Sequence, residues 1–412
     1  MKILFFTDHF APEISAPGIH IYERCKLWVE DGHKVTVVTN FPNYPLGKTY
    51  DGYKNKFRST ECLDGINVIR VCTYMSENKG SFKRILDYIS YTISSFINSL
   101  FLPKPDIVIS SSPHIFVPLS AIFFSFIKRV PHVVEIRDLW PESIAGNTGI
   151  SKSSFIYKTF EHIEMFIYKH SKKIIVFTNS FQRNITKRGV SQSKIEVIVN
   201  GANLDLFKTS SYDESLASSL GLKNKFVMGY IGTHGLSQGL TNAVLSSHFV
   251  FDDDIHFLFV GEGADKEKML KEASNIKASN ITFLTWQERE KMPNFWGICD
   301  VGLVHLKNDP VFKTVIPSKI FEIMACGKPI IYCGPDSDGS DILKEYNCGV
   351  CIEPDNPKML ADGLVKLKNN NKLINDLSIN SKNAASDFSR KNQANKTLKV
   401  LQSAVNNANN NL

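Results

Sequence analysis

The sequence predicts an α/β protein with two Rossmann-like domains, each a doubly wound parallel sheet. In the first half, buried strands alternate with helices, and strands are expected at Lys2–Thr7, Lys34–Thr39, Ile107–Ser110, His132–Ile136 and Lys173–Thr178. The pattern restarts after Asn200-Gly201, with strands at Phe226–Ile231, Ile255–Val260, Ile281–Leu284, Asp300–Leu303 and Pro329–Tyr332. Such alternation favours parallel sheets covered by helices. A length of 412 residues suits two domains of about 200 residues better than one.

These elements divide the chain into three parts. Residues 1–199 form the first domain, in which a proline-containing loop at Asp8–Gly18 joins the first strand to a helix at Ile19–Asp31. Residues 200–385 form the second domain. Residues 386–412 are expected to form a last helix with a frayed, asparagine-rich tail.

Composition and charge limit the class of protein. Hydrophobic residues make up 43% and charged residues 22% of the chain, as in soluble globular proteins. No apolar run reaches the roughly 20 residues that span a bilayer, and no signal peptide precedes Met1, so we expect a cytoplasmic protein. Residues 1–199 carry 25 Lys and Arg against 17 Asp and Glu, a net charge of +8, whereas the remainder carries 23 against 24, or −1. The first domain is therefore expected to face an anionic partner. Because no nucleic-acid motif is present, a membrane surface is the better candidate.

Two helical segments strengthen the membrane interpretation. Lys79–Leu102 and Ser151–Lys173 are rich in aromatic and aliphatic residues and carry cations at their ends, which is typical of interfacial helices. The alternative is that both bury their apolar faces in the core of the domain.

One segment of the second domain, Val315–Ile331, has the pattern of an anion-binding helix. A helix that opens at Pro317-Ser318 directs its free backbone N–H groups toward a ligand. Lys319 adds a positive charge there, and Glu322 adds a carboxylate one turn later. This set suits a diphosphate next to a ribose, although an ordinary capped helix with surface charges has the same pattern.

Taken together, the motifs resemble the family 4 glycosyltransferases of the GT-B fold, and among them bacterial O-antigen and capsule transferases such as N-acetyl-L-fucosamine transferases. The matching segments are Phe10–Ile14, Phe41–Pro45, Arg137–Ser143, Asn200–Asn203 with Phe207, Tyr230–Gly235, Gly261–Gly263 and Val315–Ile331. The resemblance implies an acceptor-binding first domain, a nucleotide-sugar-binding second domain and a central cleft between them. It also implies that the last helix crosses back to the first domain.

The resemblance assigns donor-binding roles in the second domain. Glu322 is expected to bind the ribose hydroxyls, and Pro317-Ser318 and Lys319 the diphosphate. Further donor contacts are expected from Gly18, Gly232, Thr233, His234, Gly235 and Glu262. The chain departs from the family pattern at Thr314, where many members have a glutamate, and at Thr233 and Gln238, near which most have an arginine and a lysine. Lys319 is then the leading candidate for the missing positive charge.

Catalytic candidates lie in the first domain. Asp138 follows the strand His132–Ile136 and could accept the proton of the acceptor hydroxyl, or could only pair with Arg137. Glu142 is a second carboxylate candidate, and His114 a lesser one.

We expect neither a metal nor another cofactor. Asp252-Asp253-Asp254 contains the DxD pattern of metal-dependent transferases, but it precedes a strand and reads as a solvated turn. The expected function is therefore metal-independent, retaining transfer of a hexosyl-type residue from a UDP-sugar to a polyprenyl-diphosphate-linked glycan. The enzyme would be peripheral on the inner face of the plasma membrane. Two alternatives stay open, a nucleotide-sugar epimerase of the same fold and a non-catalytic nucleotide-sugar-binding protein of a polysaccharide-assembly complex.

Overall fold

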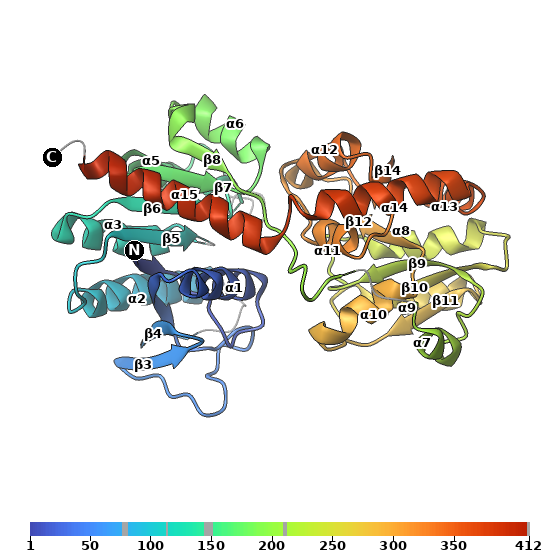
Figure 1. Cartoon of the computed structure of the whole chain (residues 1–412), viewed down its shortest axis with the longest axis horizontal. Helices are drawn as coiled ribbons and strands as arrows, with labels where there is room; N and C mark the ends of the chain where they lie inside the picture. The colour runs from blue at the N-terminus through green and yellow to red at the C-terminus, as the bar shows by residue number, and fades with distance from the viewer. Residues whose placement is uncertain (76–80, 113, 144–150, 209–211, 410–412) are drawn as a thin grey trace. The chain divides into compact units, whose positions relative to one another are not determined.

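The computed structural model describes residues 1–75, 81–112, 114–143, 151–208 and 212–409, and it separates into two compact units (Figure 1). Unit 1 comprises Met1–Val199 and Gln393–Leu412, and unit 2 comprises Asn200–Asn392. The chain therefore returns to unit 1 within its last helix, α15 (Arg390–Asn409). This helix extends into the asparagine-rich tail that the sequence predicts to be frayed.

Unit 1 contains an eight-stranded sheet in the order β3-β4-β2-β1-β5-β6-β7-β8. Its strands are β1 (Lys2–Phe6), β2 (Lys34–Asn40), β3 (Arg58–Leu63), β4 (Ile66–Val71), β5 (Ile107–Ser112), β6 (His132–Ile136), β7 (Lys173–Val176) and β8 (Ile195–Val197). All neighbours pair in parallel except β3, which runs antiparallel to β4 at one edge. Five of these strands were expected; β3, β4 and β8 were not.

Helices cover both faces of this sheet. They are α1 (Ala16–Glu30), α2 (Ser81–Ser99), α3 (Phe116–Lys128), α5 (Phe155–His170), α6 (Asn179–Lys187) and the greater part of α15, with a 3₁₀ turn η1 (Gln192–Lys194). Ile3 and Phe5 of β1 point into a core shared with α1 and α15. The alternate residues Leu4 and Phe6 point into a core shared with α2 and α3. Figure 1 accordingly shows α1 and α15 in front of the strands and α2 behind them.

Unit 2 contains a six-stranded, fully parallel sheet in the order β11-β10-β9-β12-β13-β14. Its strands are β9 (Phe226–Ile231), β10 (Ile255–Val260), β11 (Ile281–Leu284), β12 (Val301–His305), β13 (Ile330–Cys333) and β14 (Gly349–Ile352). Its helices are α7 (Glu214–Ser219), α8 (Leu240–Ser246), α9 (Lys266–Asn275), α10 (Met292–Gly297), α11 (Lys319–Ala325), α12 (Asp338–Glu345), α13 (Pro357–Lys368) and α14 (Asn371–Ala385). Short 3₁₀ turns are η2 (Ser247–Phe249), η3 (Arg289–Lys291) and η4 (Pro310–Thr314).

Both units therefore have the predicted doubly wound architecture, and the fold class is confirmed. In each unit the strand order reverses direction next to the first strand, β1 or β9, so the loops after these strands lie where open α/β sheets bind ligands. Within the described residues, we find no helix with both the length and the apolar character needed to cross a membrane.

Candidate functional sites in the two units

In unit 2, glycines bring the loop after β9 against the loop after β10. A Cβ atom on Gly261 would lie 1.9 Å from the carbonyl oxygen of Gly232, and one on Gly263 would lie 2.2 Å from that of His234. Gly232, Gly261 and Gly263 all have φ between +138° and +157°, a region that disfavours side chains. Only glycine therefore allows these two loops to touch, and their backbone forms the wall of the candidate donor site.

His234 belongs to the loop after β9 and is completely buried. Its backbone N–H donates to the carbonyl of Glu262 at 2.8 Å, and its own carbonyl accepts from Asp265 N–H at 2.9 Å. Burial, followed by the nearby charge of Lys266, lowers the pKa of the imidazole to about 4. His234 is therefore neutral near pH 7. It fixes the loop pair through its backbone and contributes no positive charge.

Lys319, the first residue of α11, reaches this loop pair. Its ammonium lies 4.3 Å from the ring centroid of Tyr230, and a Cβ atom on Gly232 would be only 2.8 Å from its Nζ. The absence of a side chain at Gly232 therefore leaves room for this cation. The Tyr230 ring holds it by a cation–π contact.

Glu322 follows one turn later, between two cations. Burial raises the pKa of its carboxyl group, while Lys319 and Arg289 act in the opposite direction. Ser318 occupies the N-cap position of α11 but has a helical backbone and makes no capping hydrogen bond through its side chain. Its hydroxyl is not used as a cap.

A second lysine holds the loop after β10. The ammonium of Lys266 donates to the carbonyls of Gly261 and Leu284 at 2.8 and 3.0 Å and pairs with Glu262 at 2.7 Å. Glu262 is exposed, so this pair fixes the side of the loop that faces solvent.

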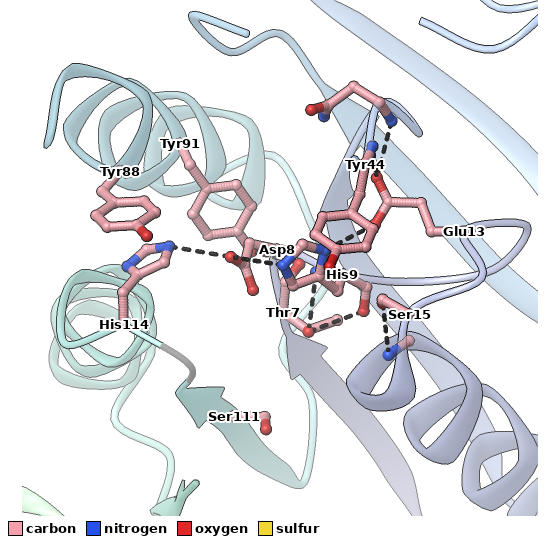
Figure 2. A network of polar contacts seen from close by, with 12 residues as sticks. Thr7, Asp8, His9, Glu13, Ser15, Tyr44, Tyr88, Tyr91, Ser111 and His114 are labelled. Carbon is pink, nitrogen blue, oxygen red and sulfur yellow. Dashed lines mark hydrogen bonds and ion pairs between the residues drawn. The ribbon is translucent and has the colours of Figure 1, made fainter. Parts of the chain in front are cut away.

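In unit 1, the corresponding loop after β1 carries paired charges in place of glycines (Figure 2). Asp8 Oδ2 lies 3.2 Å from His114 Nε2 and 3.7 Å from His9 Nε2. His9 Nδ1 lies 2.8 Å from Glu13 Oε2. Tyr88 of α2 stacks on His114 at a centroid distance of 3.8 Å. Figure 2 shows that these side chains come from the β1 loop, from α2 and from the segment before α3.

The same loop is fixed by hydrogen bonds from backbone N–H groups to side-chain oxygens. Glu13 Oε1 accepts from the N–H groups of Asn43 and Tyr44 at 2.8 and 3.1 Å. Gly18 N–H donates to Ser15 Oγ at 3.2 Å, and this bond caps α1. A Cβ atom on Gly18 would lie 2.9 Å from Ser15 Oγ, so the glycine keeps the turn narrow.

The ionisable groups of this cluster shift one another's pKa values. Burial alone would raise the pKa of Asp8, but His9 and His114 outweigh burial and lower it to about 2. Burial would lower the pKa of His9, but Asp8 and Glu13 raise it to about 9. The pKa of Asp87, on α2, is raised to about 7, first by burial and then by the charge of Asp8. Near pH 7, His9 is therefore a cation held between two carboxylates.

A separate ionic network lies along β6. Arg137 pairs with Glu135 at 2.7 Å and donates to Ser111 Oγ at 2.8 Å. Arg24 of α1 also pairs with Glu135. Burial would raise the pKa of Glu135, but both guanidinium groups lower it. Arg137 is thus directed to Glu135, and no ion pair joins it to Asp138 among the described residues.

The two carboxylates proposed as bases differ in their surroundings. Partial desolvation raises the pKa of the Asp138 carboxyl group, and the charge of Arg137 acts in the opposite direction. Because Asp138 is exposed, water screens the effect. Glu142 accepts hydrogen bonds from Asn184 Nδ2 at 3.1 and 3.4 Å. Glu142 is thus held by Asn184, whereas Asp138 is exposed just after β6.

Comparisons with known proteins agree with this architecture. Residues 18–206 match the family model described as Glycosyltransferase Family 4, and residues 212–384 match the model described as Glycosyl transferases group 1. The chain belongs to the family 4 glycosyltransferases of the GT-B fold.

The relatives that match over nearly the whole chain are distant in sequence. The transferase is 24% identical over 376 residues to an Escherichia coli (strain K12) protein named "Putative colanic acid biosynthesis glycosyl transferase WcaI", covering 88% of this chain and 91% of WcaI. It superposes on Anabaena HepE in complex with UDP-glucose with a TM-score of 0.70 at 17% identity, covering 98% of this chain and all of that one. It superposes on WaaG, a glycosyltransferase involved in lipopolysaccharide biosynthesis, with a TM-score of 0.70 at 13% identity, covering 97% and 99%.

The structure of the transferase brings together most of the residues predicted to bind the donor. Gly232, His234 and Lys319 share one loop cluster in unit 2, and Glu322 follows Lys319 by one turn of α11. Thr233 is exposed on the same loop, and its carbonyl accepts from Tyr230 Oη at 2.9 Å. A Cβ atom on Gly235 would lie 2.6 Å from the Gln238 side chain. Pro317 is half-buried ahead of α11, and its carbonyl accepts from Ile320 N–H.

Gly18 belongs to unit 1, where its N–H donates to Ser15, the N-cap residue of α1. Of the four catalytic candidates, only His114 belongs to the cluster around Asp8. Arg137, Asp138 and Glu142 lie at and after the end of β6.

Sequence reasoning missed several residues of these sites. Asp8, His9 and Glu13 fall within the predicted Asp8–Gly18 loop, and their density of ionisable groups directly after a buried strand was the available signal. Arg289, which acts on Glu322 from η3, carried no such signal because it lies more than 30 positions away in the chain.

The structure also describes the Asp252–Asp254 triplet. Asp252 pairs with Lys368 at 2.5 Å in front of β10. Across the described part of the chain, no three His, Cys, Asp or Glu side chains are grouped so that they could hold a metal ion.

Proposed function

We propose that this transferase moves a sugar from a UDP-sugar to a polyprenyl-diphosphate-linked glycan, with retention of anomeric configuration, in surface-polysaccharide biosynthesis of the O-antigen or capsule type. The sugar we favour is N-acetyl-L-fucosamine or a related acetamido or deoxy sugar. The relatives support the class of pathway, since WcaI is named for colanic acid biosynthesis and WaaG for lipopolysaccharide biosynthesis. HepE, which shares the fold, binds UDP-glucose.

The observation that carries the proposal is the glycine-built wall of unit 2 with Lys319 beside it. A diphosphate needs close backbone approach and positive charge, and this wall offers both. Glu322, with its pKa raised by burial, would accept hydrogen bonds from the ribose hydroxyls. Thr314 stands where many family members have a glutamate, which suits a donor sugar that lacks a hydroxyl group.

Unit 1 would receive the acceptor. Asp138 is the preferred acceptor-side base, with Glu142, Arg137 and His114 as further candidates. As an alternative to a protein base, a front-side reaction would let the departing diphosphate itself take the proton of the acceptor hydroxyl, and no side-chain nucleophile is then required. In that scheme Lys319 stabilises the charge that develops on the diphosphate, so that the reaction proceeds without a metal ion.

The location we propose is the inner face of the cytoplasmic membrane, where a polyprenyl-linked acceptor is anchored. The excess of positive charge lies in the first 199 residues, +8 against −1 for the rest, which favours an anionic lipid surface as partner of unit 1.

The test is incubation of the purified protein with a panel of UDP- and GDP-sugars and a polyprenyl-diphosphate-linked glycan, with mass spectrometry of the lipid-linked product. We expect a mass increase of one sugar residue with a UDP-sugar. Conversion of the donor without acceptor would indicate the epimerase, and donor binding without turnover would indicate the binding protein. Full transfer by both Lys319→Ala and Glu322→Ala would refute the donor-site assignment.

A further inference from the structure

The outer surface of α2 and α3 carries an unusual row of exposed apolar side chains. Ile85, Ile89, Ile93 and Ile97 of α2 repeat every four residues and are 36 to 55% exposed. On α3, the exposed residues Phe123, Phe126 and Ile127 continue the row. We call these seven residues the apolar ridge.

The ridge is one continuous surface. Helices α2 and α3 lie side by side and run in the same direction, since Thr92 Oγ1 donates to the Phe116 carbonyl and Lys128 Nζ donates to the Leu100 carbonyl. The rings of Phe96 and Phe123 join the two helices at 6.3 Å. Their opposite faces pack on the sheet through Tyr91 and Phe124, so the ridge is not needed to complete that core.

Most of the exposed charges that flank the ridge are positive. Lys83 and Arg84 are exposed at the start of α2, and Lys104 and Arg129 are exposed beyond the ends of α2 and α3. Helix α3 has no acidic residue, and α2 has only Asp87. Asp87 is half-buried, and burial, followed by the charge of Asp8, raises the pKa of its carboxyl group.

A cationic pocket lies at the far end of α2. It has a volume of about 210 Å³, and its lining includes the lysines Lys2, Lys34 and Lys104 together with Leu102. Asp106, an exposed acidic residue, accepts from the backbone N–H of Lys2 nearby. Next to Leu102 in the chain, Phe101 is 72% exposed. The pocket could therefore hold an anionic headgroup while Phe101 and the ridge enter the acyl region.

We propose that the apolar ridge with its flanking cations is the surface by which this transferase docks on an anionic lipid bilayer. An amphipathic surface with aliphatic and aromatic residues between cations fits the headgroup boundary. A second copy of the chain fits less well, because a two-fold contact must be self-complementary and this face would set cations against cations. The inference rests on the proposed function only in its choice of a membrane partner.

The test is flotation of the full-length protein with phosphatidylcholine vesicles containing about 30 mol% phosphatidylglycerol, with no donor or acceptor present. We expect Ile93→Glu/Phe126→Glu to lower vesicle binding by at least about tenfold. The matched control, Phe251→Glu/Ile379→Glu, changes exposed apolar residues of unit 2 (92% and 58% exposed) and should bind as the unmodified protein does. Lys104→Glu/Arg129→Glu should weaken binding to the anionic vesicles and leave binding to pure phosphatidylcholine unchanged.

Several outcomes would overturn the proposal. Unmodified protein that fails to float, or ridge and control variants that float equally, would do so. So would a dimer in sedimentation that the ridge variant dissociates without any change in vesicle binding, because the ridge would then join two copies. The ridge variant should still transfer sugar to a detergent-dispersed acceptor. Vesicle binding in a protein that transfers no sugar would refute the proposed function and leave the docking surface standing.

Discussion

The loops after β1 and β9 occupy equivalent positions in two similar sheets, yet one is rich in ionisable side chains and the other in glycine. The β1 loop is filled by ionisable side chains that lie against one another: Asp8 against His9 and His114, and His9 against Glu13. The β9 loop is kept bare by glycines, and its one histidine is neutral. A site whose charges are already paired favours hydroxyl groups, whereas bare backbone beside a lysine favours an anion. The comparison therefore supports acceptor binding by unit 1 and donor binding by unit 2.

The largest effect should come from filling the bare loop. Gly261→Ala places a Cβ atom 1.9 Å from the Gly232 carbonyl at a φ of +143°, so the two loops must separate. We expect the free energy of unfolding to fall by about 3 kcal/mol, and UDP binding to be lost. Urea unfolding and titration calorimetry measure the two effects.

Gly221→Ala is the matched control. Gly221 also has a positive φ, +69°, but a Cβ atom there would meet no atom within 4 Å. Its cost should be about 1 kcal/mol, from backbone strain alone, with UDP affinity unchanged. Equal losses in the two variants would contradict the role assigned to the loop contact.

The charged loop should make stability depend on pH. The folded-state pKa of His9, about 9, is above its ordinary 6.5, so its contribution is complete below pH 6.5 and is lost as pH rises through 9. The loss should be about 3 kcal/mol at most, and Asp8→Asn should flatten this dependence. Urea unfolding between about pH 8 and 9.5 tests this, because the range lies above the pKa of about 7 at which Asp87 titrates.

At acid pH, the contribution of Asp8 to stability has the opposite pH dependence. Because Asp8 has a pKa of about 2 against an ordinary 3.8, its contribution is present above pH 3.8 and is lost as pH falls through 2.

Asp106→Asn, the control for the alkaline prediction, changes an exposed carboxylate of the same unit and should leave the dependence of stability on pH between about pH 8 and 9.5 as it is. An unchanged slope in Asp8→Asn would show that the ion pair does not hold His9 protonated.

The two loops also differ in how far the sequence predicts them. The ten expected strands and the glycine-rich segments of unit 2 follow from local signals: apolar runs for β9 and β10, and glycine directly after each. The cluster around Asp8 depends on His114, more than 100 positions away, and on a stacking partner from α2. Contacts of this kind have no local pattern. The pairing of Arg137 with Glu135 was missed for a different reason: Glu135 lies inside a strand that reads as buried, where a charge is not expected.

Removing the ammonium group of Lys319 should have a smaller effect, on UDP binding and not on stability. Lys319→Ala takes away the ammonium next to Gly232, and a charge-assisted hydrogen bond of this kind contributes about 2 kcal/mol, or roughly thirtyfold in the dissociation constant for UDP. Lys313→Ala, at an exposed lysine of η4, should leave UDP affinity unchanged. If both variants bind UDP alike, the diphosphate does not lie against Lys319.

The smallest effect is expected from Glu322→Gln, which distinguishes recognition of the ribose of UDP from recognition of its diphosphate. Glu322→Gln keeps a hydrogen-bond acceptor but removes the charge, so UDP affinity should fall by about tenfold, or 1.4 kcal/mol. The same variant should bind a 2′,3′-dideoxyribose analogue of UDP as tightly as the unmodified protein does, because that ligand lacks the hydroxyls that Glu322 would accept from. Since burial raises the pKa of Glu322, UDP affinity should also weaken on acidification sooner than an ordinary carboxylate would allow, and this dependence should disappear in the variant. An equal loss of affinity for both ligands would instead assign Glu322 to the balance of charge around Lys319 and Arg289.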